Sequence, residues 1–186
     1  MKLKDIVKHA AVYLGLEKVI GYVESGSYSD DGDALTGVDV LTRCANLVLN
    51  ELACAYVPMI KTENLTLNGD RAYYSSLSDA PRRILCVKDV LNNDVKYETF
   101  AEYMKTEPNA ATVKYEYFPP NYDLSDTVGY DESQLPARVI SYGVAAEYSL
   151  TVKAFDESLM WRDRFENALK QTNRQKNTVI KGRQFI

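Results

Sequence analysis

The hydrophobic period of the chain changes twice, and this limits the folds that the sequence can adopt. Between residues 38 and 56, apolar side chains recur at the three- and four-residue spacing of one helix face. From residue 59 to residue 118, apolar and polar residues alternate instead, which is typical of β-strands. Helical spacing returns at residue 135. The sequence therefore predicts an α+β protein in which a small antiparallel β subdomain is inserted between helices.

About four helices are predicted from this spacing, as a mainly helical bundle. The first covers residues 3–14. The second begins near a capping Asp39 and ends before Pro58, because proline disfavours helical geometry in the residue ahead of it. The third begins at Pro136, where a proline in the first turn costs no hydrogen bond. The fourth covers residues 156–172. Its expected apolar side consists of Leu159, Met160, Phe165, Ala168 and Leu169.

Several short stretches within residues 59–118 are predicted as strands. Leu65 and Leu67 alternate with polar residues ahead of a tight turn at Gly69. The other strand candidates are residues 72–77, 83–90, 95–100 and 112–118. Residues 99–105 are expected to form a short helical turn.

Two irregular segments, residues 15–37 and 119–134, are rich in acidic residues and are expected to be exposed loops. Their acidic candidates are Asp30, Asp31, Asp33, Asp123, Asp126 and Asp131. In the first loop, Gly32 interrupts the acidic run and no glutamate lies at the distance that an EF-hand needs. We therefore interpret the loops as solvated segments or electrostatic docking surfaces, and not as metal sites.

Residues 174–186 carry basic and apolar side chains and no acidic residue. The docking candidates in this segment are Arg174, Lys176, Val179, Ile180, Lys181, Arg183, Phe185 and Ile186. A solvated end is one interpretation of the segment. An extended arm that becomes ordered on an acidic partner is another, and the two acidic loops on the same chain favour it. A contact with DNA phosphates is the third.

The composition argues against an enzyme. His9 is the only histidine in 186 residues, and phosphate-binding, dinucleotide-binding and nucleophile-elbow motifs are missing. Cys44, Cys54 and Cys86 form no CxxC pair and are expected to be reduced. We therefore expect no catalytic residue, no metal and no cofactor. No stretch approaches the roughly 20 apolar residues that span a bilayer, and the N-terminus does not resemble a signal peptide, so no membrane contact is expected.

The order of elements resembles that of the head–tail adaptor (connector) proteins of tailed bacteriophages. In that family, a proline-started, alanine-rich helix precedes a charged helix that ends in an aromatic residue, a short gap and Ala-Leu. The matching residues here are Leu135, Pro136, Phe165, Ala168 and Leu169. On this resemblance, residues 1–173 form an adaptor domain and residues 174–186 a C-terminal arm. Within the domain, the helical core covers residues 1–58 and 135–173, the β insertion residues 59–118 and the second loop residues 119–134.

The resemblance implies a structural virion protein, assembled in the host cytoplasm and located at the head–tail junction. About twelve copies would form a ring between the portal protein and a tail or nozzle protein. The arm would dock on the portal or a neighbouring subunit. The acidic loops would face the lumen or a partner, and negative charge in the lumen would let DNA pass without specific binding. A tail-completion or head-closure protein, and a small nucleic-acid-binding module that uses the basic tail, are the alternatives.

Overall fold

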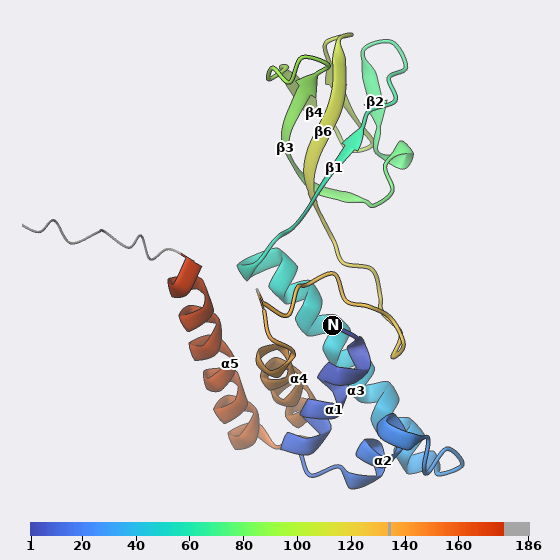
Figure 1. Cartoon of the computed structure of the whole chain (residues 1–186), viewed down its shortest axis with the longest axis vertical. Coiled ribbons are helices and arrows are strands. Elements are labelled where there is room, and N and C mark those ends of the chain that lie inside the picture. Colours follow the sequence, from blue (N-terminus) through green and yellow to red (C-terminus); the bar gives the residue numbers. More distant parts are fainter. Residues whose placement is uncertain (134, 177–186) are drawn as a thin grey trace, which may run out of the picture. The chain divides into compact units, whose positions relative to one another are not determined.

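The computed structural model describes residues 1–133 and 135–176 (Figure 1). It contains both helices and antiparallel sheets, which confirms the mixed α+β class. The chain forms two compact units, each with its own buried core. The first, which we call the helical unit, comprises Met1–Leu49 and the residues from Asn121 onward. The second, which we call the β unit, comprises Asn50–Pro120.

Five α-helices occur in the described part of the chain. They are α1 (Leu3–Tyr13), α2 (Glu17–Ser25), α3 (Gly32–Glu51), α4 (Ala137–Thr151) and α5 (Phe155–Lys176). α4 packs against α1 and α5, and α1 also packs against α2. The helices predicted over residues 3–14 and from Pro136 onward are confirmed.

Gly143 allows α4 to approach two neighbouring helices closely. A Cβ atom at this position would lie 2.8 Å from Val48 Cγ1 on α3 and 3.2 Å from Phe165 Cε2 on α5. Two residues earlier on α4, the buried Ser141 hydroxyl donates a hydrogen bond to the Ile6 carbonyl of α1 at 2.8 Å. Close packing and this buried hydrogen bond therefore fix α4 among α1, α3 and α5.

The prediction that residues 15–37 form one loop is wrong. Glu17–Ser25 forms α2, and α3 begins at Gly32 rather than near Asp39. Gly37 lies within α3, where a Cβ atom would come within 2.7 Å of Val19 Cγ2 on α2. This glycine therefore permits a close contact between two helices, and the sequence pattern had suggested a turn instead.

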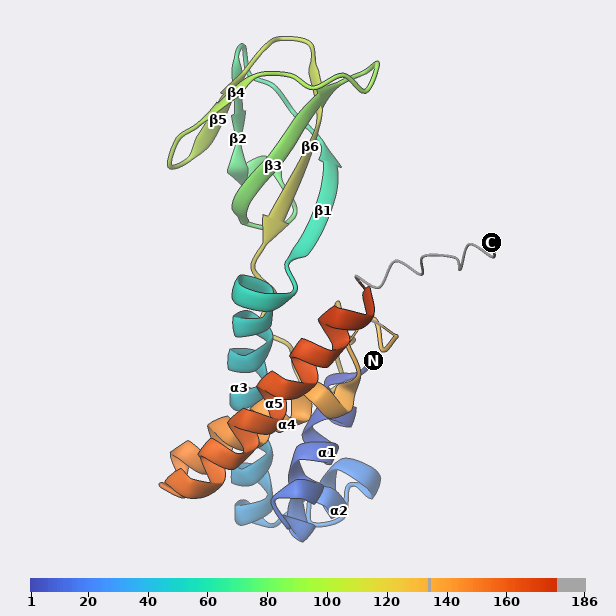
Figure 2. The same cartoon turned by 90° about the vertical axis from the view of Figure 1, so that its left-hand side faces the viewer.

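In the β unit, a π-helical turn, Leu52–Tyr56, follows α3 and ends before Pro58, as predicted. Six strands then form two antiparallel three-stranded sheets, with the orders β1-β6-β3 and β2-β5-β4 (Figure 2). The strands are β1 (Met59–Asn64), β2 (Arg71–Tyr73), β3 (Pro81–Asp89), β4 (Tyr97–Thr99), β5 (Tyr103–Thr106) and β6 (Ala110–Tyr117). Both sheets contribute to one core, which includes Ala72, Ile84, Val87, Met104, Val113 and Tyr115.

Three predictions for the β unit are wrong. The strand expected over residues 72–77 ends at Tyr73, and a 3-10 helix follows it. Residues 99–105 do not form a helical turn, because the Phe100 N–H donates to the Tyr103 carbonyl at 2.9 Å and closes a hairpin between β4 and β5. Leu65 and Leu67 follow β1 and do not belong to a strand. They still pack, half-buried, against the core of the β unit.

Candidate functional site

α5 follows α4 after a short connection (Figures 1 and 2). Large apolar side chains are exposed around this connection. We call this group the α4–α5 patch, and its members are Leu150, Val152, Phe155, Leu159 and Met160. The exposed fractions of Phe155 and Leu159 are 62% and 67%. These two residues are four positions apart in α5, so their side chains are neighbours on the helix surface. Large apolar side chains exposed side by side are typical of an interaction surface.

The prediction that Leu159 and Met160 face the core is wrong. The buried face of α5 instead consists of Ser158, Trp161, Phe165 and Leu169. Successive helical residues are rotated by about 100°, so Leu159 and Met160 both lie away from this face, and their exposed fractions are 67% and 41%. Apolar residues therefore cover more of α5 than its neighbours can bury. An apolar stripe on α5 that is wider than its neighbours can cover was the signal in the sequence for a second, exposed apolar surface.

Three stacked aromatic rings hold α5 against α1 and α4. The Tyr13 ring centroid lies 5.2 Å from that of Tyr142 and 5.3 Å from that of Trp161. Burial, together with the neighbouring Tyr142, raises the pKa of the Tyr13 hydroxyl above its ordinary value. The Arg164 guanidinium lies 4.8 Å from the centroid of the Trp161 ring. The helix that carries Phe155 and Leu159 is thereby fixed by contacts on its opposite side.

In the first acidic segment, most of the carboxylates stabilise the ends of helices. Asp31 Oδ1 accepts the Asp33 N–H at 2.9 Å and so caps α3. Asp31 Oδ2 lies 2.8 Å from Lys18 Nζ of α2, and Asp33 lies 3.6 Å from the same ammonium. The hydrogen bond from Lys18 and those from the backbone lower the pKa of Asp31. Asp30 has no hydrogen bond or ion pair within the described part of the chain.

In the second acidic segment, the carboxylates hold turns. Asp126 Oδ2 accepts the Asp123 N–H at 2.7 Å, and the Asp126 carbonyl accepts the N–H of Leu3 at 3.0 Å at the start of α1. Asp131 accepts the Ser133 N–H at 3.1 Å, which lowers the pKa of Asp131. Among the six predicted acidic candidates, only the carboxylates of Asp30 and Asp123 lack a partner among residues 1–133 and 135–176.

The predicted C-terminal arm lies partly within α5. That helix continues to Lys176, so Arg174 and Lys176 are helical residues. The other predicted docking residues lie outside the described part of the chain: Val179, Ile180, Lys181, Arg183, Phe185 and Ile186.

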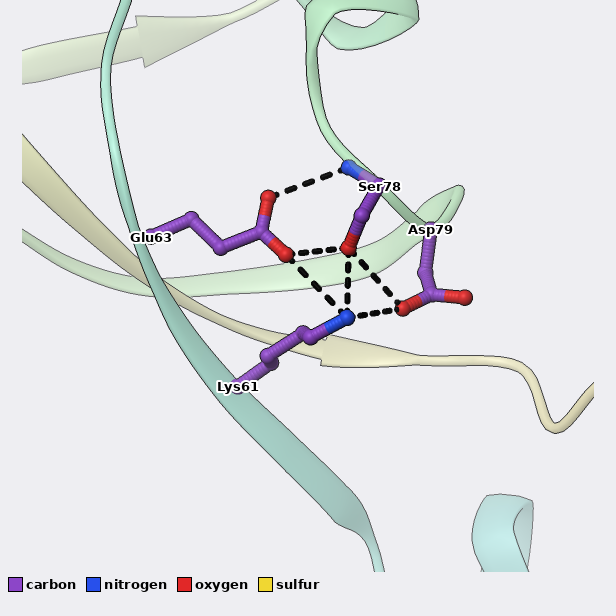
Figure 3. A network of polar contacts seen from close by, with 4 residues as sticks. All are labelled: Lys61, Glu63, Ser78 and Asp79. Atoms are coloured by element: carbon purple, nitrogen blue, oxygen red, sulfur yellow. Dashed lines mark hydrogen bonds and ion pairs between the residues drawn. The ribbon is translucent and has the colours of Figure 1, made fainter.

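A cluster of four polar side chains lies between β1 and the loop that precedes β3, and sequence reasoning missed it (Figure 3). We call it the Lys61 cluster. Lys61 Nζ donates to Ser78 Oγ at 2.5 Å and to Asp79 Oδ2 at 2.6 Å. Ser78 Oγ donates to Glu63 Oε1, and the Ser78 N–H donates to Glu63 Oε2 at 3.0 Å. Lys61 and Glu63 carry opposite charges two residues apart, and in a strand such side chains face the same side, which was the available signal.

A serine beside a lysine invites comparison with a Ser–Lys catalytic pair, but the electrostatics oppose this. The hydrogen bonds to Asp79 and Glu63 raise the pKa of Lys61, which stays protonated. The hydrogen bonds from Ser78 lower the pKa of Glu63 to about 2, which makes its carboxylate a very weak base. Neither group can take the proton of the Ser78 hydroxyl near neutral pH. The cluster therefore fastens the loop to β1 and does not activate a nucleophile.

Glu63→Gln is expected to reduce the pH dependence of the β unit's stability. The pKa of Glu63 falls from an ordinary 4.5 to about 2, so its charge stabilises the fold above pH 4.5, and this contribution is lost as the pH falls towards 2. The variant should therefore differ most from the wild type above pH 4.5, and the two should converge at lower pH. Hydrogen exchange of the backbone amides of β1, followed against pH, measures this. A constant difference between the two proteins from neutral pH down to pH 2 would contradict the assignment.

No group of three or more His, Cys, Asp or Glu side chains within residues 1–133 and 135–176 could hold a metal ion. None of the helices in that part of the chain has the length and hydropathy needed to cross a bilayer. No protein-family model matches the sequence, and no curated protein matches it either. The functional assignment therefore rests on the residues themselves.

Proposed function

We propose that this chain is a structural virion protein, a head–tail adaptor that forms a ring beneath the portal of a tailed phage and joins the capsid to the tail. The observation that carries the proposal is the α4–α5 patch. It places Phe155 and Leu159, two of the most exposed large apolar side chains of the described residues, one turn apart on one helix. An assembly subunit needs such a surface before its partner arrives.

The patch is large enough to contribute substantially to an interface. Full burial of one large apolar side chain contributes about 1.5 to 3 kcal/mol. Phe155 and Leu159 are both more than half exposed, so much of that contribution remains available for a partner. The aromatic stack on the other side of α5 keeps these side chains in position, which lowers the entropic cost of binding.

In this proposal, the helical unit is the bundle of the adaptor, and residues 174–186 act as its arm towards the portal or a neighbouring subunit. The arm begins as a continuation of α5, which gives its first residues a defined direction. The two carboxylates without partners, Asp30 and Asp123, are the acidic side chains best suited to face the lumen. The remaining acidic candidates already hold turns or a helix end.

Deletion of residues 177–186 tests the proposed arm. The shortened protein should keep the Trp161 fluorescence of the folded helical unit but should no longer co-sediment with the portal protein encoded by the same phage or prophage. Lys96→Gln is a control that removes one exposed positive charge from the β unit and should leave portal binding unchanged. Equal binding of the full and shortened chains would contradict the role given to the arm.

A further inference from the structure

The outer face of the β1-β6-β3 sheet is a polar surface, which we call the outer sheet face. Residues paired across the three strands form rows of three on this side. The rows are Ile60–Glu116–Arg83, Thr62–Lys114–Cys86 and Asn64–Thr112–Lys88. Side chains on the opposite side of the sheet, such as Val113 and Tyr115, are buried in the core of the β unit.

An irregularity in β3 determines which residues reach the outer sheet face. The pairing register shifts between Ile84 and Cys86, so one extra residue is accommodated there. As a result, Ile84 and Val87 are both buried although they are three positions apart. The same shift places Arg83 and Lys88 together on the outer side, where a regular strand would have separated them.

The three cations of the outer sheet face have no acidic partner. Arg83, Lys88 and Lys114 form no ion pair with any residue in the described part of the chain. The carboxylate on this face, Glu116, is only 7% exposed, and its Oε2 lies 3.7 Å from the Arg82 guanidinium. Arg82 thus balances the charge of Glu116, and the three cations together give the surface a positive potential.

A shallow hollow of about 190 Å³ opens between two of these cations. It is lined by Thr62, Cys86, Lys88, Asn92, Thr112 and Lys114. The Thr62 and Thr112 hydroxyls and the Asn92 amide add uncharged hydrogen-bond donors beside the ammonium groups. Lys88 Nζ lies 3.0 Å from Asn92 Oδ1, which holds this ammonium at the edge of the hollow. Asp94 is paired with Lys88 at the end of the face, but the two side chains form no ion pair.

We infer that the outer sheet face binds the phosphates of a DNA backbone through Arg83, Lys88 and Lys114. Lysine, arginine, threonine and asparagine side chains are the usual donors to phosphate oxygens in protein–DNA interfaces. Alternate residues on one side of a strand are about 6.6 to 6.8 Å apart. The three rows therefore distribute the cations over roughly 13 Å, a distance over which duplex DNA presents several phosphates.

The composition of the face favours DNA over a protein partner. The buried centre of a protein–protein interface is apolar and aromatic and is poor in lysine. The three rows of the outer sheet face contain no aromatic residue. Ile60, which is exposed, lies at the edge of the face, in the first row on β1. A polar, positively charged surface is typical of protein–DNA contacts. The lack of stacking rings also favours the backbone over unpaired bases.

Salt dependence gives this inference a quantitative test. Each phosphate neutralised on duplex DNA contributes about 0.9 to the slope of log affinity against log salt concentration. Binding of a short mixed-sequence duplex to the full chain would be measured by fluorescence anisotropy at several salt concentrations. The variant Arg83→Gln, Lys88→Gln, Lys114→Gln should bind more weakly, with a slope shallower by about 2.7 for three lost phosphate contacts.

The matched control is Arg71→Gln, Lys96→Gln, Lys105→Gln, which makes the same charge change in the same unit away from the outer sheet face. This control should keep the wild-type slope, and both variants should keep the wild-type circular dichroism spectrum. The inference is overturned if the full chain does not bind the duplex, or if the two triple variants weaken binding equally. It is also overturned if polyglutamate, as an acidic polypeptide probe, binds the face and DNA does not. Ring formation is not required for this contact, so the outcome is separate from that of the adaptor proposal.

Discussion

Phe165→Ala is expected to destabilise the helical unit by about 3 to 5 kcal/mol, the largest effect on stability that we predict. The Phe165 side chain is fully buried, and its ring lies against Gly143, where α4 lies close to both α3 and α5. The substitution removes the transfer energy of the ring and leaves a cavity. The cavity cannot collapse easily, because α4 is held from two sides by its contact with Val48 and by the Ser141 hydrogen bond.

Trp161 provides the measurement for this prediction. It is the only tryptophan in the chain, and it is buried in the helical unit, so its fluorescence reports the unfolding of that unit. Denaturant titration should give a clearly lower midpoint for Phe165→Ala. Leu159→Ala, which removes an exposed side chain from the same helix, is the control and should change the midpoint little. Equal midpoints for Phe165→Ala and the wild type would show that the core is packed differently.

The double variant Phe155→Ser, Leu159→Ser is expected to prevent assembly while leaving the helical unit folded. Both side chains are mostly exposed, so their loss removes little from the core. If each contributes about 1.5 kcal/mol or more when buried in an interface, the double variant should bind its partner on the order of a hundredfold more weakly, because about 1.4 kcal/mol corresponds to a factor of ten.

Analytical ultracentrifugation with the portal protein measures this loss, and Trp161 fluorescence confirms that the variant is folded. The matched control is Leu35→Ser, Leu47→Ser, which removes two exposed leucines from α3. This control should assemble as the wild type does. Equal losses in the two double variants would mean that assembly depends on general surface hydrophobicity and not on the α4–α5 patch.

The spacing of apolar residues correctly predicted those helices and strands whose formation depends mainly on neighbouring residues in the sequence. The helix over residues 3–14 and the helix after Pro136 each have one clear apolar face, and both are present. The π-helical turn after α3 ends at Tyr56, before Pro58, as the backbone restriction that proline imposes requires. The strand over residues 112–118 is present as Ala110–Tyr117, with Val113 and Tyr115 on its buried side.

The elements that sequence reasoning missed depend on contacts between distant segments. Gly37 resembles a loop residue by itself, and its place inside α3 is explained by the close approach of Val19 from α2. β5 is stabilised by pairing with β2 and β4 on either side, which no local pattern of residues 99–105 indicates.

The candidate site was harder to predict because exposure is a property of the packed molecule. Leu159 and Trp161 are both apolar and lie two positions apart, yet the exposed fraction of the first is 67% and that of the second 7%. The stack of Trp161 with Tyr13 and Tyr142 selects the buried side of α5. The Lys61 cluster was missed for a similar reason. It forms only because the fold brings Ser78 and Asp79 beside Lys61 on β1.

The mass of the native complex tests the adaptor proposal most directly. The purified 21.0 kDa chain would be measured by native mass spectrometry, alone and with the portal protein of the phage or prophage that encodes it. We predict a closed complex that contains many copies of the chain on each portal ring and that is lost with Phe155→Ser, Leu159→Ser. A single 21.0 kDa species in both samples, at every concentration, would contradict the proposal.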